Sequence, residues 1–278
     1  MEPKIYEKLE PGTLLWSAPT RKNPLGFGNL PRVVKEKLAK VKKSNPATLL
    51  HESGSSPTNR GQDKLHHTLH WIATFVWSNE SIILKRLGVK RRGWMLNLEQ
   101  KGLVVRVPSG TRGGSVWVLS KEGLNQARSF SGQSYPHYPQ RPERRQQANL
   151  RHDLALQHII AEKIVEEKIS AIYNGAHFST GHAEDWIPDA IVKIGNKWVG
   201  MEYERNPKYG IHREQKLRRI VLTLNRSKQS EVLFISHFET CLNDYVKEMR
   251  NGVQDLFKLD RPESVKTMKL EKDLALSV

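Results

Sequence analysis

Three carboxylates in the second half of the chain have types and spacings that could bind a divalent cation. Asp189 precedes one apolar run, Glu202 and Glu204 end the next, and Lys216 follows. Like charges that face each other in a sheet are destabilising, so a sequence keeps such a group mainly when a cation neutralises it. Hard divalent ions prefer carboxylate oxygens. The residues therefore predict a Mg²⁺ or Mn²⁺ site formed by Asp189, Glu202 and Glu204.

The turn between the two apolar runs determines how these carboxylates meet. A two-residue Gly195–Asn196 loop between apolar runs is typical of a β-hairpin. If Ile194 pairs with Lys197, the positions of paired residues have a constant sum, and Asp189 lies opposite Glu202. Side chains two residues apart on a strand share one face, so the carboxylate two positions beyond Glu202 joins the same group.

The charge balance indicates a polyanionic partner. The 278 residues include 45 Lys and Arg against 29 Asp and Glu, a net charge of +16. Such an excess favours nucleic acid as the partner, in particular double-stranded DNA. A membrane surface is not expected, because no basic amphipathic helix with a clean apolar face stands out and no run reaches membrane-spanning length.

Cysteine usage and the first residues bear on the compartment. The single cysteine, Cys241, excludes a disulfide framework and a cysteine-based zinc site. The opening residues, MEPKIYEKLEPG, lack the apolar core of a signal peptide. We therefore expect a cytoplasmic protein.

Residues 63–130 have the element order of a winged helix-turn-helix. Residues 78–89 predict a short helix that starts at Ser78 or Asn79 and stops at Gly88, and residues 90–102 predict a second helix. A β-hairpin with a Gly-rich tip follows at 103–120. The second helix of such a unit enters the major groove. The alternative is a small helical domain with solvated basic residues that serves as a protein–protein module.

The linker that follows, residues 131–148, is rich in Ser, Pro, Gln and Arg and has no apolar period. It is either a solvated tether or an additional DNA contact, in which Tyr135 and Tyr138 could stack on single-stranded bases. The residues that we expect to contact DNA are basic and lie on the first helix, at the start of the second, on the hairpin tip and in the linker: Lys85, Lys90, Arg91, Arg92, Arg112, Arg144 and Arg145.

The second domain reads as an α/β sandwich about one mixed sheet. Its predicted order is a helix, a strand, the hairpin, a helix at 211–225, a buried strand at 231–237 and a helix at 238–250. The expected fold class is thus α+β for the first domain and α/β for the second. The predicted boundaries are a basic flexible extension at 1–62, the winged helix at 63–130, the linker at 131–148, the α/β domain at 149–258 and a low-structure tail at 259–278.

The acidic motif resembles the PD-(D/E)XK nuclease superfamily. Pro188 and Asp189 followed by Glu202-x-Glu204 are similar to its signature, although Glu204 stands where the superfamily usually has lysine. Some members carry the lysine on the next helix, and Lys216 is similar to that variant. The resemblance implies a restriction-endonuclease-like α/β/α fold for the second domain.

A narrower resemblance covers roughly residues 66–250. A winged helix followed by His152 with Leu154, and then by the acidic motif and helical lysine, resembles the MOBC-type or replication-relaxation mobilisation relaxases. It implies a metal-dependent enzyme that nicks one DNA strand at a plasmid or mobile-element origin of transfer, with relaxosome accessory proteins as partners. In this interpretation Lys216 orients the nucleophile or stabilises charge, and His152 contacts phosphate or braces the site.

Four alternatives remain open at this point. The protein could be a non-catalytic DNA-binding relaxosome or replication accessory protein, or a restriction-type endonuclease. The carboxylates could form an acidic edge that is paired with Arg205, Arg213 or Lys216, and His152 could be a packing histidine.

Overall fold

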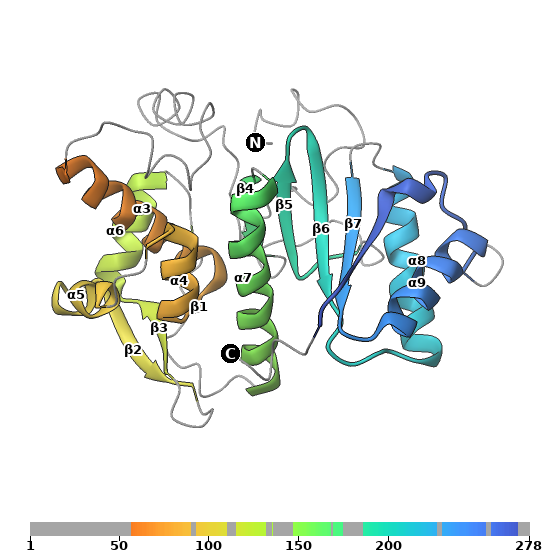
Figure 1. The fold of residues 1–278 in the computed structure, drawn as a ribbon, viewed down its shortest axis with the longest axis horizontal. Helices are drawn as coiled ribbons and strands as arrows, with labels where there is room; N and C mark the ends of the chain where they lie inside the picture. The colour runs from red at the N-terminus through yellow and green to blue at the C-terminus, as the bar shows by residue number, and fades with distance from the viewer. Residues whose placement is uncertain are drawn as a thin grey trace, which may run out of the picture. The chain divides into compact units, whose positions relative to one another are not determined.

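The computed structural model describes residues 57–89, 93–109, 115–131, 135, 147–167, 169–174, 186–226, 230–253 and 257–271. The chain forms two compact units that divide between Ser170 and Ala171. The N-terminal unit is described from residue 57 to 170 and the C-terminal unit from residue 171 to 271 (Figure 1). Both combine helices with a sheet, so the chain is a mixed α and β protein, as predicted.

The N-terminal unit combines helices with a three-stranded antiparallel sheet of order β1-β3-β2. Its described elements, in chain order, are α3 (Pro57–Phe75), β1 (Trp77–Ser78), α4 (Glu80–Leu87), α5 (Trp94–Gln100), β2 (Val104–Pro108), β3 (Ser115–Leu119), α6 (Lys121–Ser131) and α7 (Gln147–Glu167).

The short helix α4 begins and ends where the sequence predicts. The Asn79 side chain accepts a hydrogen bond from the backbone N–H of Ile82 at 2.9 Å, and Gly88 ends the helix with φ of 64°. A side-chain oxygen at the N-cap satisfies a helical donor, and glycine adopts the left-handed region without a Cβ clash. Glu80 in the first turn also accepts the backbone N–H of Gly93 at 2.9 Å, which ties α4 to the start of α5.

Helix α7 groups with the N-terminal unit, whereas the sequence predicts it as the start of the second domain. The buried Gln157 side chain accepts a hydrogen bond from Trp71 Nε1 at 3.0 Å and donates one to the carbonyl of Trp77 at 2.9 Å. Lys85 of α4 also pairs with Glu162. The amphipathic pattern predicts the helix but does not determine which core its apolar face packs against. The predicted domain boundary at 148/149 therefore lies before the helix, whereas the observed division lies after it.

A group of basic side chains lies in the interior of the N-terminal unit. Arg86 is only 7% exposed. Burial and the nearby Arg86 charge lower the pKa of His67 to about 3 and that of His70 to about 4. His70 Nδ1 also lies at hydrogen-bond distance from the Tyr135 hydroxyl. Both imidazoles are therefore neutral in the folded unit at neutral pH.

We expect acid to destabilise the N-terminal unit. A histidine whose folded pKa is lowered contributes stability above its unfolded pKa of 6.5, and loses it as the pH falls toward the folded pKa. Between about pH 7 and about pH 5 the unfolding free energy should fall by on the order of 2 kcal/mol for each of the two histidines. Urea unfolding at several pH values measures this, and a His70→Gln variant should show a shallower dependence. A flat profile would contradict the buried neutral state.

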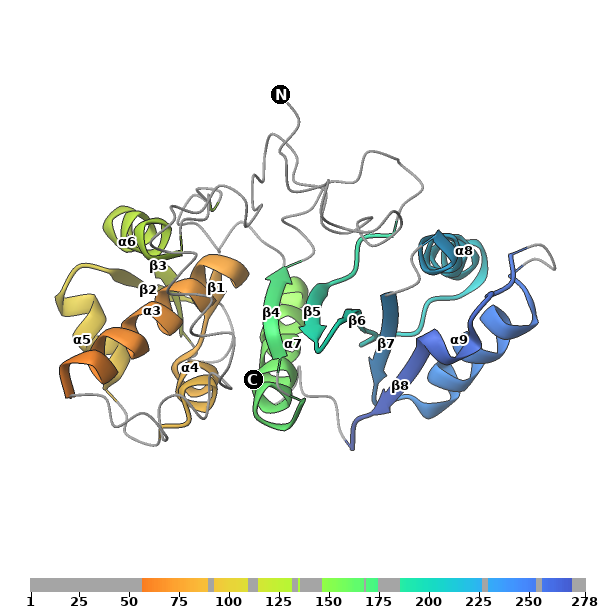
Figure 2. The same cartoon turned by 90° about the horizontal axis from the view of Figure 1, so that it is seen from above.

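The C-terminal unit is built on a five-stranded mixed sheet of order β4-β5-β6-β7-β8, shown from above in Figure 2. Strands β5 and β6 are antiparallel, whereas β6, β7 and β8 are parallel. Its elements are β4 (Ile169–Asn174, whose first two residues precede the division), β5 (Ala190–Ile194), β6 (Lys197–Tyr203), α8 (Gly210–Arg226), β7 (Ser230–Ser236), α9 (Glu239–Asn251), the 3-10 turn η5 (Pro262–Ser264) and β8 (Val265–Lys269).

Helices α8 and α9 cover one face of this sheet. Each connects two neighbouring parallel strands, and the two connections progress in the same direction across the sheet. Right-handed crossovers place both helices on the same face. They contact each other and both contact β7. Because β6 and β7 are parallel, their carboxyl ends lie at the same edge of the sheet. In open α/β sheets, ligands bind at this edge.

The predicted tail at 259–278 is wrong over residues 259–270. Leu259 is 4% exposed, and its backbone N–H donates to the carbonyl of Met249 at 3.3 Å. Strand β8 pairs in parallel with β7, with Phe234 opposite Thr267. The strand is short and rich in lysine, a composition typical of edge strands, so its sequence does not have the apolar pattern of a central strand.

Within the part of the chain that the structure describes, none of the helices has both the length and the apolar character needed to span a membrane.

Candidate functional site

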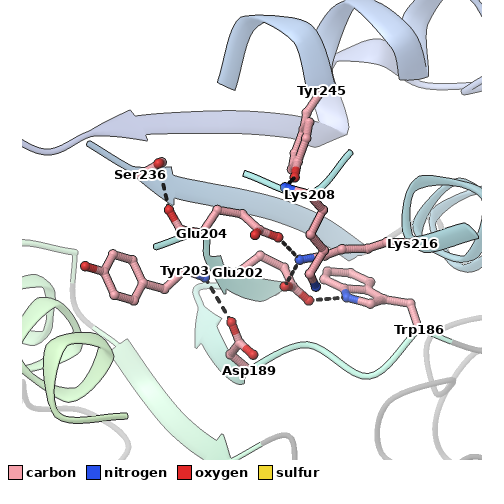
Figure 3. Close-up of polar contacts among 9 residues, drawn as sticks. All are labelled: Trp186, Asp189, Glu202, Tyr203, Glu204, Lys208, Lys216, Ser236 and Tyr245. Atoms are coloured by element: carbon pink, nitrogen blue, oxygen red, sulfur yellow. Dashed lines mark hydrogen bonds and ion pairs between the residues drawn. The ribbon is translucent and has the colours of Figure 1, made fainter. Parts of the chain in front are cut away.

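The predicted hairpin has the predicted register. Ile194 pairs with Lys197 and Ala190 with Met201, so the next position along the ladder sets Asp189 opposite Glu202. Glu204 follows the last residue of β6. The three carboxylates therefore come from the start of β5 and the end of β6, as Figure 3 shows.

Two buried glutamates converge on one ammonium group. Glu202 and Glu204 are each 4% exposed. Lys216, on the second turn of α8, donates hydrogen bonds to Glu202 Oε2 and Glu204 Oε1 (Figure 3). The lysine thus points back over the hairpin from the following helix, as predicted. The buried lysine and the two glutamates stabilise one another, because removal of the lysine or of the glutamates would leave buried charges without partners.

Trp186 fixes the second oxygen of Glu202. Its indole Nε1 donates a hydrogen bond to Glu202 Oε1. The ring lies over Gly200 on the neighbouring strand, where a Cβ would come within 2.5 Å of a ring carbon. Gly200 therefore makes room for the indole, and both oxygens of Glu202 are held.

Backbone hydrogen bonds position the other two carboxylates. The Tyr203 N–H donates to Asp189 Oδ2 at 3.0 Å. The Glu204 N–H donates to the carbonyl of Ile235 at 2.8 Å, and Ser236 Oγ donates to the Glu204 carbonyl at 2.7 Å. These hydrogen bonds fix the Glu204 backbone to the end of β7. The position of its side chain therefore does not depend on the loop that follows.

The surroundings of the acids alter their protonation. Burial and the nearby Asp189 charge raise the pKa of Glu202 to about 7, against the opposing effects of Lys216 and Trp186. Burial alone would lower the pKa of Lys216, but the charges of Glu202 and Glu204 outweigh it and raise that pKa above its ordinary value. The lysine is therefore protonated, while Glu202 can take up or release a proton near neutral pH.

The donor set suits a hard cation in its chemistry. All three side chains offer carboxylate oxygens, and two of them already converge on a single positive charge. Within the described ranges, however, no group of three His, Cys, Asp or Glu side chains is arranged so that it could hold a metal ion. The Lys216 ammonium occupies the point at which the two glutamates meet.

The remaining predicted site residues lie elsewhere or outside the described ranges. His152 is on α7 in the N-terminal unit, with Nδ1 3.4 Å from Asp153 Oδ1, so its role at the acids stays a prediction. Lys85 pairs with Glu162, which reduces its value as a DNA contact. The other predicted DNA-binding residues lie outside the described ranges: Lys90, Arg91, Arg92, Arg112, Arg144 and Arg145.

Two contributors to the site are not evident in the sequence. Trp186 stands three residues before Asp189, and nothing in its position separates a carboxylate ligand from a core tryptophan. Tyr245 of α9 accepts a hydrogen bond from the backbone N–H of Lys208 at 3.2 Å and anchors the loop after Glu204 (Figure 3).

Comparison of this chain with protein-family models, curated proteins and solved structures finds no match. Its own geometry therefore carries the functional argument.

Proposed function

We propose that the protein is a metal-dependent DNA endonuclease that nicks one strand, with its reaction centre at Asp189, Glu202, Glu204 and Lys216. The observation that carries the proposal is the convergence of two buried glutamates on one buried lysine, next to a third carboxylate, at the carboxyl end of β6. Phosphodiester cleavage needs an activated nucleophile and neutralisation of the charge that develops on phosphorus. Carboxylates and a fixed cation supply both. The same features support a PD-(D/E)XK-like fold for the C-terminal unit.

Asp189, Glu202 and Glu204 would hold a Mg²⁺ or Mn²⁺ ion, which would supply Lewis-acid stabilisation and a nucleophile of lowered pKa. Burial raises the pKa of Glu202 to about 7 in the absence of an ion, so binding of the ion should release a proton from this carboxyl near neutral pH. Protonated Lys216 can neutralise phosphate oxygens. The hydrogen bond from Trp186 keeps the Glu202 carboxylate in one orientation.

The N-terminal unit would bring DNA to this centre as a winged helix-turn-helix. Its order, α3-β1-α4-α5 followed by the β2–β3 hairpin on a small sheet, supports this interpretation. Lys90, Arg91 and Arg92 immediately precede α5 in sequence, and the net charge of +16 favours a polyanion. Sites of the origin-of-transfer type, with relaxosome proteins as partners, fit a nicking enzyme of this organisation.

Salt should weaken DNA binding steeply. If Lys90, Arg91, Arg92 and Arg112 contact phosphates, each neutralising substitution should reduce the slope of log affinity against log salt by about 1. Fluorescence anisotropy with a labelled duplex over a salt series measures the slope. Replacing Lys269, which pairs with Glu239, should leave it unchanged. Slopes that do not differ between these variants would contradict the docking proposal.

Conversion of supercoiled plasmid to the open circle tests the proposed activity. Nicking should need Mg²⁺ or Mn²⁺ and stop with EDTA. Asp189→Ala and Glu202→Ala preparations that nick as fast as the unaltered protein would overturn the proposal, and linear product from unaltered protein would point to a restriction-type enzyme instead.

One observation favours a second candidate function. Lys216 already pairs with both buried glutamates, so a positive charge lies between them without a metal ion. This suits a non-catalytic DNA-binding accessory protein with a nuclease-like unit. Tight sequence-specific binding without cleavage of the same DNA in any divalent metal would support that alternative.

A further inference from the structure

Exposed apolar side chains gather in the segments next to the acidic site. The structure describes five large apolar residues as exposed, and four belong to these segments: Ile187 (41%), Tyr209 (74%), Ile211 (62%) and Phe238 (39%). Exposed apolar side chains that gather in one patch rimmed by polar residues mark a binding surface, whereas single exposed apolar residues do not. We propose that Tyr209, Ile211, Phe238 and Ile187 form a stacking surface that binds the unpaired bases of a DNA strand. The proposal rests on the proposed function for the identity of the substrate.

Each of the four residues is tied to the acids by the chain or by hydrogen bonds. Ile187 lies between Trp186 and Pro188, two residues before Asp189. Phe238 donates its backbone N–H to Ser236 Oγ at 3.1 Å, and that hydroxyl donates to the Glu204 carbonyl. The segments that carry Ile187 and Phe238 therefore begin next to Trp186 and Ser236, which position Glu202 and Glu204.

Tyr209 ends the loop that leaves Glu204, and Ile211 lies in the first turn of α8, directly after Gly210. Gly210 between them begins the helix with φ of 55°, a left-handed conformation that favours glycine. The buried Tyr245 hydroxyl accepts the Lys208 N–H and holds the loop to α9. An anchored loop presents its two apolar side chains at a defined position rather than as a mobile flap.

The charges in the same loop identify the ligand. Arg205 and Lys208 precede Tyr209 on this loop, and His212 follows Ile211 on α8. Lys208 is exposed, and Figure 3 shows its side chain pointing toward the side on which Glu202 and Lys216 lie. Aromatic faces alternating with cations are how proteins bind single strands, because bases stack on the rings and phosphates meet the cations.

A paired duplex does not offer its base faces, so this surface selects a strand that is unpaired at the site of cleavage. An uncharged peptide partner would not need the neighbouring cations. Tyr209 is the most exposed of the four and carries an aromatic ring, so it should contribute most.

A single-stranded oligodeoxynucleotide that contains 2-aminopurine tests this binding in EDTA, where no cleavage occurs. Its fluorescence falls when the base analogue stacks. We expect full-length protein and Tyr209→Phe to quench it, and Tyr209→Ala to bind about tenfold more weakly and to lose most of the quenching. Unchanged quenching with Tyr209→Ala, or equal loss with Tyr209→Phe, would overturn the inference.

The outcome is separable from that of the proposed function. If plasmid nicking never occurs but Tyr209→Ala still loses quenching, the single-strand surface stands and the nuclease proposal falls. If nicking occurs and quenching is the same in both tyrosine variants, the surface falls and the nuclease proposal stands.

Discussion

Replacing Lys216 by methionine is expected to lower the free energy of unfolding by about 3–5 kcal/mol, because the change leaves two buried carboxylates without their counter-ion. Glu202 and Glu204 are each 4% exposed and both accept hydrogen bonds from Lys216. Methionine keeps much of the side-chain length, so the effect reports charge rather than lost volume. Urea unfolding followed by tryptophan fluorescence measures it.

Lys269 provides a matched control on the same unit. It pairs with Glu239, but the two side chains are 57% and 59% exposed, so Lys269→Met should cost no more than about 1 kcal/mol. Combining Lys216→Met with Glu202→Gln and Glu204→Gln should restore much of the loss, since no buried charge is then left unpaired. Equal effects of Lys216→Met and Lys269→Met would contradict the role assigned to Lys216.

Replacing Glu202 by glutamine is expected to slow nicking by at least about 10²-fold, because it removes a proposed ligand of the ion that would activate the nucleophile. Glutamine keeps the shape of the side chain, and its amide oxygen can still accept the hydrogen bond from Trp186. One proposed metal ligand is lost, while Glu204 still pairs with Lys216. Initial rates of open-circle formation in Mn²⁺ measure the effect.

Glu231 is the appropriate control for a change of this kind. It is a glutamate of the same sheet, 4% exposed, and pairs with Lys197 and Lys266. Glu231→Gln removes a buried lysine-paired carboxylate at the opposite end of β7 and should leave nicking close to the unaltered rate. Similar losses in the two variants would show that reduced stability, and not lost chemistry, explains the slow rate.

The sequence predicts the hairpin because a two-residue Gly195–Asn196 loop permits one register, and the constant sum of paired positions carries that register to Asp189 and Glu202. Lys216 is assigned to the site because the acidic motif resembles nucleases that carry the lysine on the next helix, and the crossover from β6 returns α8 over the hairpin. Local rules of turn and strand geometry determine the register of the hairpin but not the position of this lysine.

Other features depend on long-range packing, which local rules do not determine. The apolar face of α7 could cover either core, and only the hydrogen bonds of Gln157 to Trp71 and Trp77 decide for the N-terminal unit. Strand β8 is short and basic, and it is a strand because β7 offers a free edge. The hydrogen bond from Trp186 to Glu202 depends on the space that Gly200 leaves.

The most direct test of the account is anomalous scattering from a crystal of the protein soaked in Mn²⁺. The carboxylates of Asp189, Glu202 and Glu204 should bind the ion, so we predict an anomalous peak between Asp189 and Glu202, with the Lys216 ammonium displaced from its position between the two glutamates. A map without that peak, in which Lys216 still joins Glu202 to Glu204, would contradict the assignment of this cluster as a metal-dependent reaction centre.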